Sequence, residues 1–285
     1  MIESLVEQGW AEHEKDSAGV LARCEGAIPE VTEAKHLPGL AALLVHVAGE
    51  HLGEWKRGLS ALDRMMSLPV VKAGTAEAQA LLRSRATLLL ASGDRATADE
   101  VIARAQTAGL PVASTRIRVL AVAASALAGQ KQVEAGVALF EEALSLAAYG
   151  PDKADPAARA LAVTGNNLAC SLEEKKVRTP AEDRLLELAA RTGRRFWEVA
   201  GTWIEVERAE YRLAMTCLAL GRAKDAVTHA NECLALCEKN GADAGELFFA
   251  NEALARAHKA RMVELLAEVD AGIRPWCEET LKKLG

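Results

Sequence analysis

The chain has 285 residues and a net charge of −6, and 50% of its residues are hydrophobic although only 4% are aromatic. The acidic balance argues against a nucleic-acid-binding protein, because such proteins normally carry a clear excess of Lys and Arg. A chain of this length is too long for one ordinary hydrophobic core and suits an array of stacked repeats. Alanine and leucine supply most of the apolar residues, and no alternating Val, Ile and Thr pattern predicts a sheet.

The start of the chain, MIESLVEQGWAEHEKD, is acidic and amphipathic and lacks the basic-then-apolar pattern of a signal peptide. No stretch reaches the roughly 18 to 20 uncharged apolar residues that a membrane span needs. The six cysteines occur without a secretory context, which predicts reduced thiols. We therefore expect a cytoplasmic protein with no membrane contact.

Helix-start signals divide the first half of the chain into paired helices. Residues 2–14 and 17–27 form the first predicted pair, with Asp16 or Ser17 as the cap. An apolar helix over 37–52 follows. Later starts are predicted at Thr75, at Asp94 or Ala96, and at Pro111. The helix after Pro111 is apolar all round, so it should be central.

Two histidines, His46 and His51, lie on the predicted helix 37–52. A separation of five residues puts them about 140° off register on an α-helix. They cannot share one face of such a helix. We therefore predict no metal site from this pair and interpret both as ordinary satisfied or exposed histidines.

The segment 149–156, with sequence YGPDKADP, is the strongest break in the chain. We interpret it as a loop between repeats; the alternative is a hinge between subdomains 1–148 and 157–285. Thr179 and Pro180 predict the start of the second helix after this segment, because Pro suits the first helical position. Further helices are expected around 157–175, around 242–259 and in an amphipathic closing segment.

An aromatic-rich segment, FWEVAGTW at 196–203, leads into the last predicted repeat. Aromatic residues at this spacing are typical of a core between long helices, and a recognition patch is the alternative. Gly201 interrupts the segment and is expected to bend the helix or to allow close packing.

The stretch 208–240 is interpreted as two antiparallel helices joined at Gly221. Small apolar residues follow this turn at helical spacing: Ala223, Ala226, Ala230 and Cys233. Looser copies follow Gly53, Gly93, Gly129 and Lys176, and the copy at Gly129 fits only after a slip of two residues. A hairpin of this size cannot bury its apolar faces alone, so the copies must stack.

This pattern resembles the tetratricopeptide repeat (TPR) over about residues 37–260, although the turn points lie farther apart than the family period of about 34 residues. The longer spacing leaves a cousin helical-repeat superfamily as the alternative. The resemblance implies an all-α fold, a right-handed α-solenoid of stacked antiparallel helix hairpins. The predicted organisation is a single solenoid over 1–285, with N-terminal cap helices at 1–36, hairpins at 37–148 and 157–260, and a C-terminal capping helix at 261–285.

The resemblance also implies a concave groove lined by the first helix of each hairpin. An asparagine at the position that Asn167 matches holds a peptide backbone through its two-sided amide in that family. Arg83 and Arg116 are expected to face the groove in earlier copies. The predicted peptide-binding residues are Asn166, Asn167, Arg208, Tyr211, Arg212 and Met215.

Arginine can hold a carboxylate through two parallel hydrogen bonds, so the expected partner is a protein or peptide with an acidic segment or a C-terminal carboxylate. The alternative is that the arginines pair with Glu205, Glu207 and Glu210 along the helices. The lysines of the family's carboxylate-clamp class are absent at the matching positions.

His229, Cys233 and Cys237 lie near one stripe of a predicted helix, and Cys217 on the partner helix offers a fourth ligand of the kind that zinc prefers. The first and last of the three lie about 12 Å apart along the helix axis, too far for one tetrahedral ion. We interpret the cysteines as small buried thiols and predict neither a metal site nor a cofactor.

No P-loop, dinucleotide-binding glycine pattern or nucleophile elbow is present in the sequence, so an enzyme is not expected. The predicted function is a non-catalytic protein- or peptide-binding adaptor that contacts no nucleic acid. The alternatives are a regulatory sensor for a small molecule or signalling peptide in an enclosed groove, and a structural or oligomerisation module.

Overall fold

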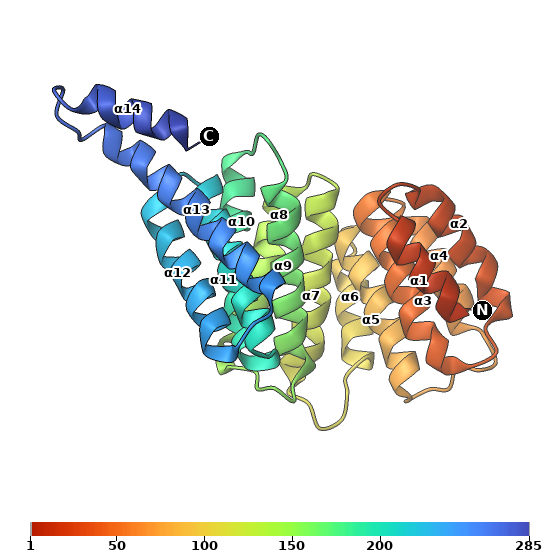
Figure 1. The fold of residues 1–285 in the computed structure, drawn as a ribbon. Helices are drawn as coiled ribbons and strands as arrows, with labels where there is room; N and C mark the ends of the chain where they lie inside the picture. Colours follow the sequence, from red (N-terminus) through yellow and green to blue (C-terminus); the bar gives the residue numbers. More distant parts are fainter. Residues whose placement is uncertain (1, 285) are drawn as a thin grey trace. The chain divides into compact units, whose positions relative to one another are not determined.

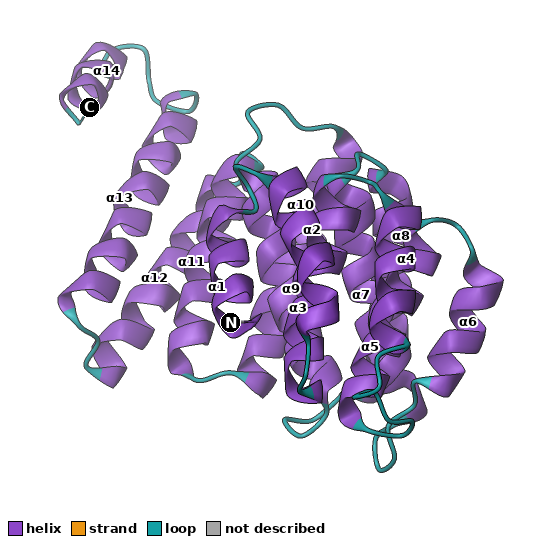
Figure 2. Ribbon diagram, turned by 90° about the vertical axis from the view of Figure 1, so that its right-hand side faces the viewer, coloured by secondary structure: helices purple, strands orange, loops and turns teal. Residues whose placement is uncertain are grey.

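The structure, a computed structural model, describes residues 2–284, and these contain helices but no strand (Figure 2). The all-α prediction is confirmed, and this part of the chain contains fourteen α-helices. The chain divides into two compact units, Met1–Ala160 and Leu161–Gly285. The boundary lies inside helix α9 (Pro156–Glu173).

The first unit contains eight complete α-helices (Figure 1). Their bounds are α1 Ile2–Glu12, α2 Ser17–Ala27, α3 Leu37–Val45, α4 Trp55–Met66, α5 Ala76–Ala91, α6 Arg95–Arg104, α7 Val112–Gly129 and α8 Val133–Leu146. Consecutive helices pack together, as α5 does with α6 and α7 with α8, and α7 also packs on α5.

The second unit holds the rest of α9 and five further helices (Figure 1). Their bounds are α10 Pro180–Ala200, α11 Trp203–Ala219, α12 Ala223–Asn240, α13 Ala244–Leu266 and α14 Arg274–Lys283. Helix α11 packs on α10, α12 and α13. The core between α11, α12 and α13 is built mainly from small side chains, such as Ala214, Ala226 and Ala253, which allow the helices to approach closely.

Helix starts follow the predicted caps. The Thr75 hydroxyl accepts a hydrogen bond from the Ala78 N–H, and the Asp94 carboxylate accepts one from the Thr97 N–H. Thr179 begins α10 with a reciprocal capping box, in which the Glu182 carboxylate accepts from the backbone N–H of Thr179. These contacts are local in sequence, which explains why the sequence predicts them.

The turn residues between paired helices adopt the left-handed conformation. Gly53, Gly93 and Gly221 have φ values of 65°, 91° and 68°. In the α7–α8 turn Lys131, with φ 61°, takes this position, two residues after Gly129. The slip of two residues in this copy therefore has a structural counterpart. Gly129 serves close packing instead, because a Cβ there would lie 2.5 Å from the Glu50 carbonyl oxygen.

Helix α3 continues into one turn of π-helix, η3 (His46–His51), instead of ending or continuing as an α-helix. The Leu52 N–H donates to the Val47 carbonyl, an i to i−5 bond of 3.1 Å. The prediction that His46 and His51 lie on different faces is wrong, because it assumed α-helical rotation through this segment.

The aromatic segment at 196–203 contributes to the core. Phe196 and Trp197 are buried, whereas Trp203 is half-buried. Gly201 separates α10 from α11, and a Cβ there would lie 2.8 Å from the Trp197 carbonyl oxygen. Helix α7 is the one helix of the described residues long and apolar enough to cross a membrane; 67% of it is buried against the other helices of its unit, which is also the situation of a core helix.

Candidate functional site

A cavity of about 520 Å³ lies in the second unit, between α9, α11 and the start of α13. Four predicted binding residues line it: Asn166, Arg208, Tyr211 and Arg212. They come from two helices that the repeat pattern expects to contribute to one surface. The structure therefore brings together most of the predicted set.

Two members of the predicted set do not line this cavity. Asn167 is exposed, and its side-chain oxygen accepts a hydrogen bond of 3.3 Å from the Asn166 amide. Met215 is 4% exposed and packs in the core formed with α12 and α13. On α9 the asparagine that reaches the cavity is Asn166, one position before the one that the family alignment favours.

The two cavity arginines are held by carboxylates of neighbouring helices. Arg212 donates to Glu173 of α9 at 2.7 Å, and both side chains are largely buried. Arg208 pairs with Glu246 of α13 through one edge of its guanidinium, while its side chain remains 65% exposed. The arginines are paired, as the alternative interpretation expects, but with residues from α9 and α13.

The cavity wall carries carboxylates as well as guanidinium groups. Glu207, Asp243 and Glu246 line it beside the two arginines, so acidic side chains outnumber basic ones. The site is therefore polar and mixed in charge, and it suits a ligand that offers both donors and acceptors.

Glu207 is the most unusual of these carboxyl groups. It is 1% exposed, and one oxygen accepts a hydrogen bond of 2.8 Å from the Cys233 thiol. Burial raises the pKa of Glu207, and the nearby Glu246 carboxylate also raises it. The other oxygen, Oε2, is buried without a hydrogen-bond partner among the described residues.

The opposite kind of unpaired group lies on the next turn of α11. The Nε–H of Arg212 is buried and has no acceptor among residues 2–284. A buried polar group without a partner costs about 1 to 3 kcal/mol. Both unpaired atoms are inaccessible to solvent, so they lie behind the cavity surface instead of facing into it.

Aromatic rings border the same cavity. Phe249 is 54% exposed, and its ring meets that of Tyr211 edge to face with centroids 6.4 Å apart. The Tyr211 hydroxyl donates to Glu252 at 3.0 Å, and burial together with this bond raises the pKa of Tyr211 to about 12. Tyr211 is therefore a neutral, oriented ring at the cavity edge.

The sequence interpretation did not assign Glu207, Glu246 and Phe249 to the site. The adjacent pair Phe248 and Phe249 offered a signal, because two neighbouring aromatic residues on a helix cannot both face the core. The carboxylates carried no such signal, since Arg208 and Glu246 lie 38 positions apart in sequence.

The cysteine and histidine set on α11 and α12 is engaged in contacts within the unit. Cys217, Cys233 and Cys237 are buried, and burial raises the pKa of each thiol, to about 11 for Cys237. His229 donates to Glu210 at 2.7 Å. These contacts are consistent with the interpretation as buried, unreactive thiols.

Two half-buried arginines in the first unit differ from the rest. Neither Arg83 of α5 nor Arg118 of α7 forms an ion pair with a described residue, and burial together with the Arg118 charge lowers the pKa of Arg83 to about 10. Arg116, by contrast, donates to Asp99 at 2.7 Å.

The fold and the site define an all-α protein with a polar, aromatic-edged cavity in its second unit. No protein-family model matches the chain, and no curated protein matches it.

Proposed function

We propose that this protein is a non-catalytic, cytoplasmic adaptor that binds an extended peptide segment of a protein partner in the cavity of the second unit. The proposal includes the architecture implied by the repeat resemblance, a right-handed TPR-like solenoid of stacked antiparallel hairpins. The left-handed turn residues and the packing of consecutive helices support that assignment.

The observation that carries the proposal is the accessible lining of the cavity, where the 65% exposed Arg208 and the 54% exposed Phe249 lie beside several carboxylates. A peptide segment supplies carbonyl acceptors, N–H donors and side chains, so it can contact guanidinium, carboxylate and aromatic groups together.

Residues at the edge of the cavity would select the side chains of the bound peptide. The exposed Phe249 ring beside Tyr211 offers an apolar contact. Arg208 is exposed and uses only one edge for Glu246, so it can take an acidic side chain or a C-terminal carboxylate of the partner.

The second candidate is a sensor for a small molecule or signalling peptide. The volume of about 520 Å³ lies within the usual range for small-ligand sites, roughly 300 to 1,000 Å³. The guanidinium and carboxylate groups of the lining would then bind one compact polar ligand with an aromatic contact.

The test uses a plug variant and a matched control. Gly245 lines the cavity, its N–H donates to Asp243 at 2.8 Å, and a Cβ would meet only the Asp243 carboxylate. Gly272 has the same relationship to Asp270 but does not line the cavity. Gly245→Leu should therefore obstruct the cavity at little structural cost, and Gly272→Leu should not.

A displayed library of random peptides is selected on the wild-type protein, and the enriched peptides are titrated by fluorescence anisotropy. We expect at least about tenfold weaker binding to Gly245→Leu and unchanged binding to Gly272→Leu, equivalent to about 1.4 kcal/mol or more. Equal binding to both variants would place the peptide site elsewhere. If no peptide is enriched while a small-molecule library raises the melting temperature, the sensor becomes the better proposal.

A further inference from the structure

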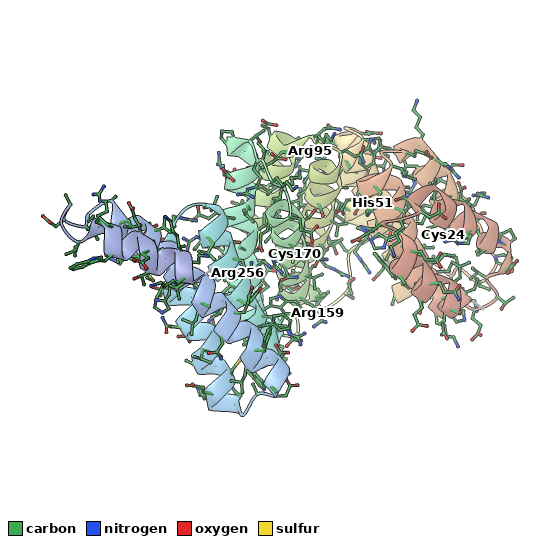
Figure 3. The ribbon with its side chains drawn as sticks, turned by 45° about the horizontal axis from the view of Figure 1, so that its top comes forward. Cys24, His51, Arg95, Arg159, Cys170 and Arg256 are labelled. Carbon is green, nitrogen blue, oxygen red and sulfur yellow. The ribbon has the colours of Figure 1, made fainter. Side chains whose placement is uncertain are left out.

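Three histidines converge in the first unit. His13 follows α1, and His46 and His51 lie at the two ends of the π-turn η3; Figure 3 labels His51. The ligand nitrogens of the three lie within 4.8 Å of one another. The Nε2 atoms of His46 and His51 are 3.0 Å apart.

The π-turn is what places two of these rings together. Its hydrogen bonds join residues five apart, so residues i and i+5 share a face, whereas an α-helix separates them. π-helical turns are rare in proteins. Those that do occur often lie at functional sites. The sequence spacing that argued against a metal pair becomes favourable in this local geometry.

The hydrogen bonds of the rings fix which nitrogens are free. His13 Nδ1 lies 2.7 Å from the Trp10 carbonyl oxygen, which can only accept, so Nδ1 carries the proton. His46 Nδ1 lies 3.1 Å from the Glu50 carboxylate and donates to it in the same way. The Nε2 atoms of His13 and His46 therefore carry the lone pairs. Without an ion, that of His46 accepts from His51 Nε2–H, so His51 must take its other tautomer to bind an ion through Nε2.

Ser125 of α7 and Gln130, the residue after α7, hold Glu50 behind His46. Ser125 donates to Glu50 Oε2 at 3.0 Å, and the Gln130 side chain donates to the Glu50 backbone carbonyl at 2.8 Å. A carboxylate that accepts from a ligand histidine orients the ring and raises its basicity, and this arrangement recurs around zinc.

We propose that His13, His46 and His51 bind a divalent transition-metal ion, with Zn²⁺ as the preferred ion and Glu50 as the carboxylate that positions His46. Neutral imidazole suits Zn²⁺, Cu²⁺ and Ni²⁺ more than Mg²⁺ or Ca²⁺. Three protein ligands leave one tetrahedral position for water or another ligand.

The geometry is close to what zinc needs. Zinc–nitrogen bonds of about 2.0 to 2.1 Å place tetrahedral ligand atoms roughly 3.3 to 3.4 Å apart. The 3.0 Å separation of the His46 and His51 nitrogens is near that value. All ligand nitrogens lie within 4.8 Å of one another, so a small rotation of a ring brings the set to the distances that zinc needs. The ion would join the end of α1 to the π-turn.

The binding test uses tag-free protein stripped with a chelator and titrated with Zn²⁺ by calorimetry, with Co²⁺ as a spectroscopic probe. We expect one ion per chain with a dissociation constant below about 10 µM, and Co²⁺ absorption typical of tetrahedral nitrogen ligation. His51→Ala should weaken binding at least about a hundredfold, and Glu50→Gln by roughly 10- to 100-fold.

The exposed His258 of α13 provides the control, and His258→Ala should bind as the wild type does. All variants are first compared by circular dichroism, and His51→Asn replaces His51→Ala if the latter is misfolded. No binding below about 100 µM, or equal affinity of the wild type and the His51 variant, would overturn the proposal. The close histidine contact would then be a simple hydrogen bond between neutral rings.

Discussion

Glu207 and Glu210 lie one turn apart on α11, both are buried, and the pKa of one is raised while that of the other is lowered. Burial opposes ionisation of both carboxyl groups. Hydrogen bonds from His229 of α12 and Arg194 of α10, of 2.7 and 2.5 Å, outweigh burial at Glu210 and lower its pKa. Glu207 faces Cys233 and Glu246 and has no cation of its own.

Glu210→Gln should be strongly destabilising at neutral pH, because it leaves Arg194 and His229 without their carboxylate. We expect a loss of about 3 kcal/mol, or a fall of roughly 6 to 12 °C in melting temperature. The folded pKa lies below the unfolded value of about 4.3, so this stability is present above about pH 5 and is lost as the pH falls through the folded pKa. Thermal melts from neutral to acidic pH measure the difference.

Glu207→Gln provides the control of opposite sign. Its folded pKa lies above the unfolded value, so full stability is present below about pH 4.3 and is lost as the pH rises through the folded pKa. The variant should raise the melting temperature at pH 7 and should have little effect near pH 4. If both variants shift the melting temperature in the same direction at neutral pH, the assignment of charges on α11 is wrong.

Gly165 and Gly193 allow α9 and α10 to approach backbone to backbone. A Cβ on Gly165 would lie 2.6 Å from the Ala189 carbonyl oxygen and 2.7 Å from the Gly193 nitrogen, and backbone atoms cannot rotate away. Gly165→Ala should therefore cost about 2 to 3 kcal/mol in a denaturation experiment. Gly193→Ala should cost less, because its nearest contact would be 3.2 Å.

Gly26 of α2 supplies the control for this series, since a Cβ there would meet nothing within 4 Å. Gly26→Ala should stabilise the protein by roughly 0.5 to 1 kcal/mol through higher helix propensity. A neutral effect of Gly165→Ala would mean that the two helices are farther apart in solution.

Local chemistry made much of this fold predictable. The caps at Thr75, Asp94 and Thr179 bind backbone groups within three residues, so the sequence contains both partners. The π-turn is different, because it depends on distant residues. The side chain of Gln130, directly after α7, donates to the Glu50 carbonyl, and no local sequence pattern predicts that contact.

The candidate site also combines residues that local sequence predicts with residues that only tertiary packing brings in. Arg208, Tyr211 and Arg212 could be predicted, because helical spacing places them on one face and the repeat resemblance assigns that face to a groove. Their acidic partners come from other helices, as Glu246 of α13 does, and tertiary packing alone determines those contacts. The arginines of the cavity could therefore be predicted from the sequence. The carboxylates that balance their charge could not.

Arg83 on α5 is expected to lower stability rather than raise it. It is half-buried beside Arg118, and burial together with this like charge lowers its pKa to about 10. Arg83→Met keeps the aliphatic stem and removes the charge, so we expect a gain of about 1 kcal/mol in urea unfolding. Arg85→Met, two residues away, removes a 2.9 Å bond to Asp63 and should give no gain. Equal gains from both variants would show that general charge, and not burial beside the like charge of Arg118, is responsible.

Asp155 holds the loop between α8 and α9 from inside the first unit. It is 3% exposed and accepts hydrogen bonds from the Ser114 hydroxyl at 2.6 Å, the Tyr149 hydroxyl at 2.5 Å and the Ala157 N–H at 2.9 Å. Asp155→Ala leaves three donors without an acceptor, of which those of Ser114 and Ala157 are buried, so we expect a loss of about 3 kcal/mol.

Tyr149→Phe removes only one of these donors, from a ring that is itself exposed, and should cost about 1 kcal/mol or less. Hydrogen exchange of the 149–157 amides provides the local measurement. Faster exchange there in Asp155→Ala than in Tyr149→Phe is expected, because the carboxylate, and not the tyrosine ring, joins the loop to α7. Equal exchange in the two variants would mean that packing around Ala157, instead of Asp155, keeps the loop closed.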